Sequence, residues 1–226
     1  MKTTDAGALP ERLRMALSRG GLAASAYWLL KRIARLDIHF FLATKLSPVA
    51  FARPRGLVVI ALRSQADLQQ IGENVITGLD AQCGMGVKAL LSGGHRMYAL
   101  LNGEEPVCQL NIGFHAISID APTRLLVNIG RDDCFLSFLY TVPLWRGRNL
   151  AKELIGLACS DLAQGGWHRC ICHVRATNVP SLRAFRRNGW DTAGVLATTV
   201  GGRLIAAPGL TASGIRLETL TSKAKD

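Results

Sequence analysis

One stretch constrains the fold of this chain more than any other: an apolar run, a basic glycine-bearing turn and a helical pattern. The run 134–143, CFLSFLYTVP, is rich in aromatic and β-branched residues, which predicts a buried strand that ends at its proline. The turn WRGRNLA (145–151) follows, and apolar residues then recur at helical spacing up to Leu162. Free N–H groups and the dipole at the start of such a helix favour an anion, and we expect a phosphate there.

A second strand and a second helix complete this unit. Gly165-Gly166 ends the first helix, because glycine readily takes the left-handed conformation. The run 168–174, HRCICHV, predicts a strand, and a short helix is expected from about Val179 to Arg187, closed by Asn188-Gly189. The unit is therefore strand, helix, strand, helix.

The residues of this unit resemble the GNAT (Gcn5-related) family of acyl-CoA acyltransferases. The family's central motif is Arg or Gln, two residues, Gly, one residue, then Gly or Ala, after a strand that ends in a proline-containing turn. Here it stands as 146–151, RGRNLA, preceded by 141–145, TVPLW. The family's later signature is matched by Asn178, Ser181, Phe185, Gly189 and Trp190. The similarity is clearest over 134–190 and extends from about 56 to 217.

The resemblance implies an α/β fold with a mixed central sheet and helices on both faces, and the pattern of the preceding residues adds an N-terminal helical extension. It also implies acetyl-CoA, or another acyl-CoA, as co-substrate and no metal. In the family the motif strand splays from its neighbour at a bulge and binds the pantetheine arm through its backbone, while the turn binds the pyrophosphate. The residues implied to bind the cofactor are Leu139, Thr141, Val142, Arg146, Gly147, Arg148, Asn149, Leu150, Ala151, Asn178, Ser181 and Phe185.

Two positions depart from the family's pattern. Asn149 replaces the middle glycine of the phosphate loop, and asparagine tolerates unusual backbone angles better than most residues. We therefore expect a distorted or weaker phosphate site. Phe185 stands where many relatives carry a tyrosine acid, so it is expected to pack on the cofactor. Simpler interpretations remain open: Arg146 and Arg148 as a solvated turn, and Asn178 as a helix N-cap.

The general base is not fixed by the sequence. The candidates for catalysis are Asp132 and Asp133 at the entrance of the motif strand, His115 on the preceding strand, and Tyr140. His115 has a suitable intrinsic pKa. A structural interpretation is also open for three of these residues: His115 as a satisfied structural histidine, Asp133 as a turn cap and Tyr140 as a core residue. A water relay is a further alternative.

Composition and charge limit the class of protein. With 226 residues and 49% hydrophobic content, the chain can bury a sizeable core. The net charge is +11, and nucleic acid is not expected as a partner because no recognised motif accompanies the charge. Without a visible secretion signal, we expect the six cysteines to be reduced and the protein to be cytoplasmic and bacterial, either free or bound at the inner face of the membrane.

The N-terminal part of the chain carries most of the excess charge. Residues 1–55 hold ten Lys or Arg and three Asp or Glu, and apolar residues recur there at helical spacing. We expect a basic amphipathic helical extension and linker over 1–55, and the acyltransferase domain over 56–220. Residues 9–46 could contact a membrane peripherally, pack on the domain or form a homodimer contact.

A cluster of thiols and imidazoles raises the alternative of a metal site. Cys170 and Cys172 lie beside His168 and His173. In a strand, His173 points to the opposite face from the other three, so the four cannot converge. A core strand is the preferred interpretation, and no metal is expected.

The remaining elements are expected from local patterns. We expect a strand at 56–62, helices at 65–74 and 87–91, and strands at 95–101 and 105–119 joined by Asn102-Gly103. Further strands are expected at 193–200, 203–207 and 213–219.

These observations favour an acetyl-CoA-dependent N-acyltransferase. The acceptor is expected to be a small-molecule amine, such as an amino-sugar or envelope-polysaccharide precursor. A non-catalytic module that binds acyl-CoA and a protein or peptide N-acetyltransferase are the alternatives.

Overall fold

The computed structural model describes residues 33, 35–49, 54–83, 86–119 and 125–220, and the element bounds below refer to these. Its largest unit is an eight-stranded sheet in the order β10-β9-β1-β8-β7-β4-β3-β2. The strands are β1 (Leu36–Lys45), β2 (Val58–Leu62), β3 (Arg96–Asn102), β4 (Glu105–Phe114), β7 (Asp133–Thr141), β8 (Arg169–Arg175), β9 (Asp191–Thr199) and β10 (Leu204–Ala206). β7 and β8 pair in parallel, and the other neighbours pair antiparallel. This confirms the predicted mixed sheet.

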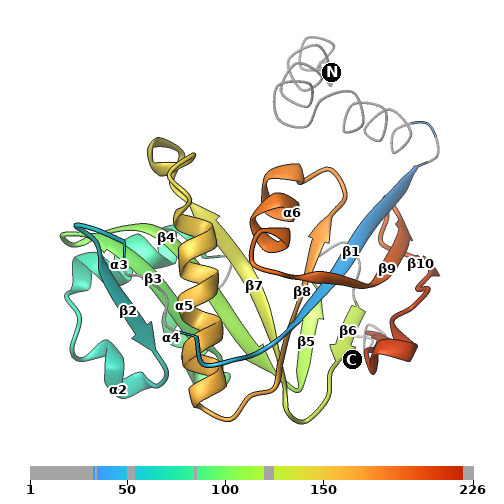
Figure 1. The fold of residues 1–226 in the computed structure, drawn as a ribbon, viewed down its shortest axis with the longest axis horizontal. Helices are drawn as coiled ribbons and strands as arrows, with labels where there is room; N and C mark the ends of the chain where they lie inside the picture. The colour runs from blue at the N-terminus through green and yellow to red at the C-terminus, as the bar shows by residue number, and fades with distance from the viewer. Residues whose placement is uncertain (1–32, 34, 50–53, 84–85, 120–124, 221–226) are drawn as a thin grey trace, which may run out of the picture.

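Side-chain alternation along the strands divides the core into two faces. Cys134 and Leu136 of β7 join one cluster, whereas Phe135 between them joins another. α5 (Leu150–Gln164) and α6 (Val179–Arg186) cover the first face, and Figure 1 shows α5 lying across the sheet. We call this the helical face of β7 and β8.

Two further layers cover the opposite face. The short helices α2 (Gln65–Leu68), α3 (Glu73–Gln82) and α4 (Val87–Ser92) pack on β2 and β3. A three-stranded sheet, β11-β6-β5, packs over β8, β1 and β9; its strands are β5 (Ala116–Ile119), β6 (Leu125–Asn128) and β11 (Arg216–Thr219). Two 3-10 turns, η1 (Pro143–Trp145) and η2 (Thr211–Ser213), complete the described elements.

Several local predictions are confirmed with small shifts. The hairpin of β3 and β4 forms, although its two turn residues are Gly103 and Glu104, one position later than expected. The helix expected at 65–74 is instead α2 and α3, separated by a break before Glu73. The strand expected at 105–119 is interrupted at His115, whose φ of 66° cannot continue a strand.

The N-terminal boundary requires a correction. The sequence predicts that residues 36–46 belong to an extension outside the domain, but β1 lies inside the large sheet, between β8 and β9. The apolar residues of β1 partly match a helical period, and pairing with a strand on each side overrides that local periodicity. The helical pattern expected over residues 9–32 lies outside the described residues. Among the described helices, none is long and apolar enough to cross a membrane.

Candidate functional site

A groove of about 970 Å³ opens on the helical face, between β7, the start of α5, and α6. Its volume falls at the upper end of the range typical of small-molecule sites. The lining residues are 139–141 of β7, 145–147 and 149–152 at the turn and α5, and 177, 178, 180, 181, 183, 184 and 187 at α6. Figure 1 shows that β7 and β8 diverge toward the end of the molecule that carries the turn and α6. This divergence separates the segments that line the groove.

The divergence begins at a defined residue pair. β7 and β8 pair only from Asp133–Arg169 to Leu136–Cys172. Immediately beyond, β7 holds one extra residue between Ser137 and Tyr140 relative to β4, and Phe138 has a φ of 49°. An extra residue with an αL-like angle is a β-bulge, which bends the strand and increases its twist. The bulge therefore turns β7 away from β8 and leaves that backbone edge outside any strand ladder, as the resemblance implied.

The turn after β7 presents unbonded backbone N–H groups to the groove. Gly147 and Asn149 both have left-handed angles, with φ of 81° and 61°. Within the described residues, Glu153 is the first residue after Arg146 whose N–H bonds back to the turn, at 3.1 Å from the carbonyl of Asn149. The N–H groups of 147–152 thus have no described partner, as at a helix start that can bind an anion.

Basic side chains surround the same groove. Arg146, Lys152, Arg183 and Arg187 all line it. The guanidinium of Arg146 is held in place, because its Nε donates to the carbonyl of Thr141 at 3.0 Å. This concentration of positive charge next to free N–H groups suits a polyanionic ligand.

Most of the predicted cofactor residues come together in the groove. Those that line it are Leu139, Thr141, Arg146, Gly147, Asn149, Leu150, Ala151, Asn178 and Ser181. Asn178 also has the simpler role considered above: it is the N-cap of α6, and its side chain accepts from the N–H of Ser181 at 3.4 Å. Its carboxamide therefore fixes the start of α6 at the wall of the groove.

Three predicted cofactor residues do not line the groove. Val142 uses its backbone internally, donating to Val107 at 3.0 Å and accepting from Trp145 at 2.9 Å, so it has no free groups for a pantetheine arm. The guanidinium of Arg148 stacks over the ring of Trp145 at 4.6 Å. Phe185 is 2% exposed and packs against Trp190, with ring centroids 4.8 Å apart, so it is a core residue.

The catalytic candidates separate in space. Tyr140 lines the groove, beneath the guanidinium of Arg146 at 5.9 Å. Asp133 lies at the other end of β7, roughly 20 Å along the strand, and its carboxylate is paired with Arg169. His115 is exposed at that same distant end, after Phe114 that pairs with Cys134. The assignments of Asp133 and His115 as bases are therefore wrong for a reaction in this groove.

Sequence reasoning missed several lining residues. These are Trp145, Lys152, Thr177, Pro180, Arg183, Ala184 and Arg187. A signal was available for two of them: Arg183 and Arg187 are four residues apart and so share one side of α6. Trp145 and Thr177 gave no such signal, since their positions depend on how the strands diverge.

A buried thiol borders the groove but does not offer a nucleophile. The Sγ of Cys108 lies 3.2 Å from the hydroxyl of Thr141. Burial raises the pKa of Cys108 to about 11, so it stays a neutral thiol near pH 7. Its role is to pack beneath the groove wall.

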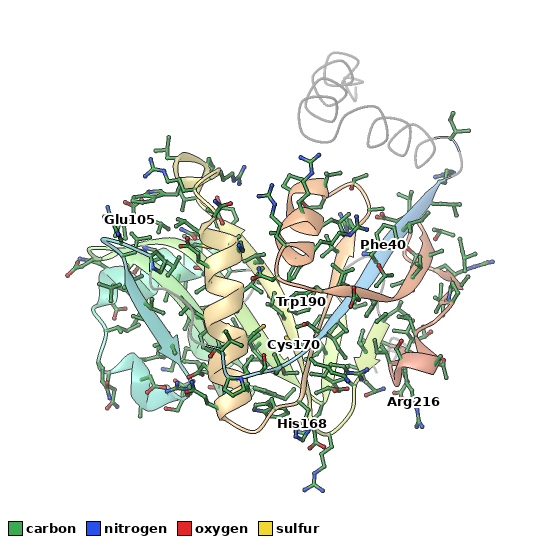
Figure 2. All side chains as sticks on the ribbon, viewed as in Figure 1. Phe40, Glu105, His168, Cys170, Trp190 and Arg216 are labelled. Atoms are coloured by element: carbon green, nitrogen blue, oxygen red, sulfur yellow. The ribbon has the colours of Figure 1, made fainter. Side chains whose placement is uncertain are left out.

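The thiol and imidazole cluster on β8 does not converge. Cys170 and Cys172 are buried in the helical-face core, whereas His168 is exposed. Figure 2 shows His168 at the lower rim and Cys170 inside the fold. Among the described residues, no three His, Cys, Asp or Glu side chains are placed to hold a metal ion.

Comparison with known proteins supports the identity of the fold. Residues 80–190 match the model of the Acetyltransferase (GNAT) family, a segment that runs from α3 to Trp190 and includes every lining residue of the groove. A search of curated proteins finds no match to this chain.

Solved structures that are similar to parts of this chain have low sequence identity and TM-scores below 0.5. The GCN5-related N-acetyltransferase from Kribbella flavida is 15% identical, with a TM-score of 0.45, over 79% of this chain and 62% of that one. The GCN5-related N-acetyltransferase from Sphaerobacter thermophilus is 14% identical, with a TM-score of 0.49, over 80% of this chain and 58% of that one. An acetyltransferase of the GNAT family from Colwellia psychrerythraea is 13% identical, with a TM-score of 0.47, over 72% of this chain and 55% of that one.

This chain thus spans less than two thirds of the length of each of these proteins. The family model matches the segment that holds the bulged strand, the basic turn and α6. Over residues 80–190, about half of its length, the chain belongs to the Acetyltransferase (GNAT) family.

Proposed function

We propose that this protein is an N-acyltransferase that uses acetyl-CoA, or another acyl-CoA, as acyl donor and an amine as acceptor. The observation that carries the proposal is the groove beside Leu139, whose polar end combines the free N–H groups of 147–152 with four basic side chains. A diphosphate is the chemical group that best matches such an end. The apolar end at β7 suits an extended arm that hydrogen-bonds to the unpaired strand edge.

The reaction needs few further parts. The amine must be neutral to attack the thioester carbonyl, and the leaving thiolate must receive a proton. Tyr140 is the residue of the expected catalytic set that lines the groove, and its phenol is the proton donor we assign to the thiolate.

The cofactor part of the proposal is tested by binding. CoA at a hundred times its dissociation constant should stabilise the protein by about 2.7 kcal/mol, seen as a rise in Tm. Arg183→Ala should weaken CoA binding, whereas Arg186→Ala is the matched control because Arg186 is on the same helix but does not line the groove. Equal loss in both variants, or no stabilisation of the wild type, would contradict the proposal.

The acceptor class is proposed on chemistry alone. We infer a small amine such as an amino sugar of an envelope-polysaccharide precursor. Acetyl-CoA with glucosamine, a diamine and a short peptide as separate acceptors, read as released thiol, tests this class. A preference for the peptide would instead favour a protein or peptide N-acetyltransferase.

A non-catalytic acyl-CoA module is the second candidate. The observation that favours it is that the described lining of the groove holds no carboxylate and no histidine. CoA binding without thiol release from any acceptor would support this candidate.

Membrane contact is proposed only for the segment before β1. Residues 36–45 are excluded because they pair with β8 and β9 within the sheet. Flotation with liposomes containing anionic lipid, with and without residues 1–32, tests whether that segment binds the surface.

A further inference from the structure

One side of α6 brings two arginines to the groove. The residues of this helix and its C-terminal cap that line the groove are Pro180, Arg183, Ala184 and Arg187. Positions three and four residues apart share one side of a helix, with Cβ atoms about 5–6 Å from each other. The other side of α6 is buried in the helical-face core. The packing of α6 therefore places Arg183 and Arg187 next to each other along the groove.

The protein supplies no anionic partner for this pair among the described residues. Both arginines are exposed, and the arginines found in ion pairs are Arg63, Arg169 and Arg175. The segment 179–187 contains no Asp or Glu. Like charges four residues apart destabilise a helix, so the stability of α6 does not explain the pair. A bound anion would offset this repulsion.

The other wall of the groove holds a different kind of anion site. There the free N–H groups of 147–152 stand beside the guanidinium of Arg146. Figure 1 shows α6 at the same end of the molecule as this turn. The start of α6 offers fewer backbone donors, because Pro180 has no N–H and the N–H of Ser181 donates to the side chain of Asn178. An anion at α6 must therefore be bound by the guanidinium groups.

Two separate sets of anion-binding groups suit a ligand with two separate phosphate groups. CoA has a diphosphate, which leads to the pantetheine arm, and a phosphate monoester at the 3′ position of its ribose. A phosphate monoester carries about −1.5 to −2 charge at pH 7, and arginine binds such a group through two parallel hydrogen bonds. Dephospho-CoA lacks this group, and so does phosphopantetheine attached to a carrier protein.

We propose that Arg183 and Arg187 bind the 3′-phosphate of CoA, so that the enzyme selects CoA thioesters over donors without this group. The inference rests on the proposed function and names its donor class. The diphosphate then lies at the free N–H groups of the turn, and the adenosine extends from there toward α6. The 3′-phosphate is remote from the thioester, so the two arginines act on the affinity for the donor and leave the chemical step unchanged.

The test is calorimetry of the full-length chain with CoA and with dephospho-CoA, which keeps the diphosphate. The wild type should bind CoA about tenfold or more tightly than dephospho-CoA. The double variant Arg183→Ala/Arg187→Ala should lose this preference, with its Kd for dephospho-CoA within about twofold of the wild-type value. Arg186→Ala is the matched control, because Arg186 is exposed on the same helix but does not line the groove. The control should keep both wild-type affinities.

Two results would overturn the inference and leave the proposed function intact. One is equal affinity of the wild type for CoA and dephospho-CoA. The other is an equal loss of both affinities in the double variant, which would assign the arginines to the diphosphate. If the wild type binds neither ligand, the proposed function fails and this inference fails with it.

Charge reversal and kinetics give two independent measurements. Arg187→Glu should bind dephospho-CoA more tightly than CoA, because the carboxylate repels the 3′-phosphate, and an unreversed preference would count against the inference. With the best of the three acceptors above, replacing acetyl-CoA by its dephospho analogue should raise KM about tenfold or more and change kcat by less than about twofold. A fall in kcat at unchanged KM would contradict a role in donor binding.

Discussion

Leu136 of β7 and Cys172 of β8 are the last residues that the two central strands pair, and the groove begins just beyond this pair. Beyond it, one face holds the groove at Leu139, and the other holds the imidazole of His173. The bulge at Phe138 is the physical cause, because the extra residue bends β7 out of the parallel ladder. The predictions below test parts of this arrangement separately.

Asn149 sets the shape of the anion-binding turn. It has a left-handed backbone with φ of 61°, and its side chain makes no capping bond to α5. Asn149→Gly should lower the Kd for CoA, because it removes a side chain where the ligand approaches and keeps the required angle. Asn149→Ala removes the same amide but strains the backbone, and should be less stable than Asn149→Gly by about 1 kcal/mol. Calorimetry of CoA binding and urea unfolding measure the two effects; weaker CoA binding in Asn149→Gly would show that the amide itself contacts the ligand.

Asp133 is expected to stabilise the fold rather than take part in chemistry. It accepts from the Nε of Arg169 at 2.9 Å and from the N–H of Gly130 at 3.0 Å. Asp133→Asn should reduce the free energy of unfolding by about 3 kcal/mol, because it leaves Arg169 without its ionic partner. The neighbouring Asp132, whose side chain is 67% exposed, is the control, and Asp132→Asn should change stability by less than about 0.5 kcal/mol. Lost turnover in a stable Asp133→Asn protein would return Asp133 to the catalytic candidates.

Phe185 should not be convertible into the missing acid. Its ring is buried against Trp190, so a tyrosine hydroxyl there would have to be buried as well. Phe185→Tyr should destabilise the protein by about 1–3 kcal/mol and leave kcat unchanged. Tyr140→Phe at the groove is the comparison, and should lower kcat without a comparable loss of stability. A large rise in turnover for Phe185→Tyr would mean that the ring can reach the cofactor.

His173 makes stability depend on pH in a defined window. Its pKa is lowered to about 3 in the folded protein, against about 6.5 in the unfolded chain. Between these values the unfolded state binds a proton that the folded state does not, so stability falls as the pH drops below about 6.5. One such group contributes up to about 1.4 kcal/mol per pH unit.

Comparing the wild type with His173→Phe isolates the contribution of His173 to the pH dependence of stability. His95 also has a pKa lowered by burial and adds to the acid sensitivity of the wild type. In His173→Phe the His95 contribution remains, so the loss of unfolding free energy from pH 7 to pH 5 should be smaller than in the wild type but not zero. Urea unfolding at both pH values measures it, and identical losses in the two proteins would contradict the buried, neutral state of His173.

Local sequence determined the central unit of this protein. The apolar run before Pro143, the helical spacing after Asn149 and the glycines at 165–166 each act over a few residues, and β7 and α5 form where those patterns place them. The left-handed angle of Asn149 agrees with the intrinsic tolerance of asparagine for unusual backbone angles. Family motifs then located most of the groove, since the backbone around 139–151 is continuous in sequence.

Tertiary structure decided what depends on contacts between distant residues. β1 takes its place between β8 and β9 by pairing over more than a hundred residues of sequence separation, a choice that the local pattern of residues 36–45 does not contain. The same long-range pairing brings His39 next to His173, and the divergence of β7 from β8 puts Tyr140 at the groove while Asp133, at the other end of β7, lies far from it. Short-range propensities act within a few residues, whereas strand neighbours and the fork at Leu136 are set by the packing of the whole sheet.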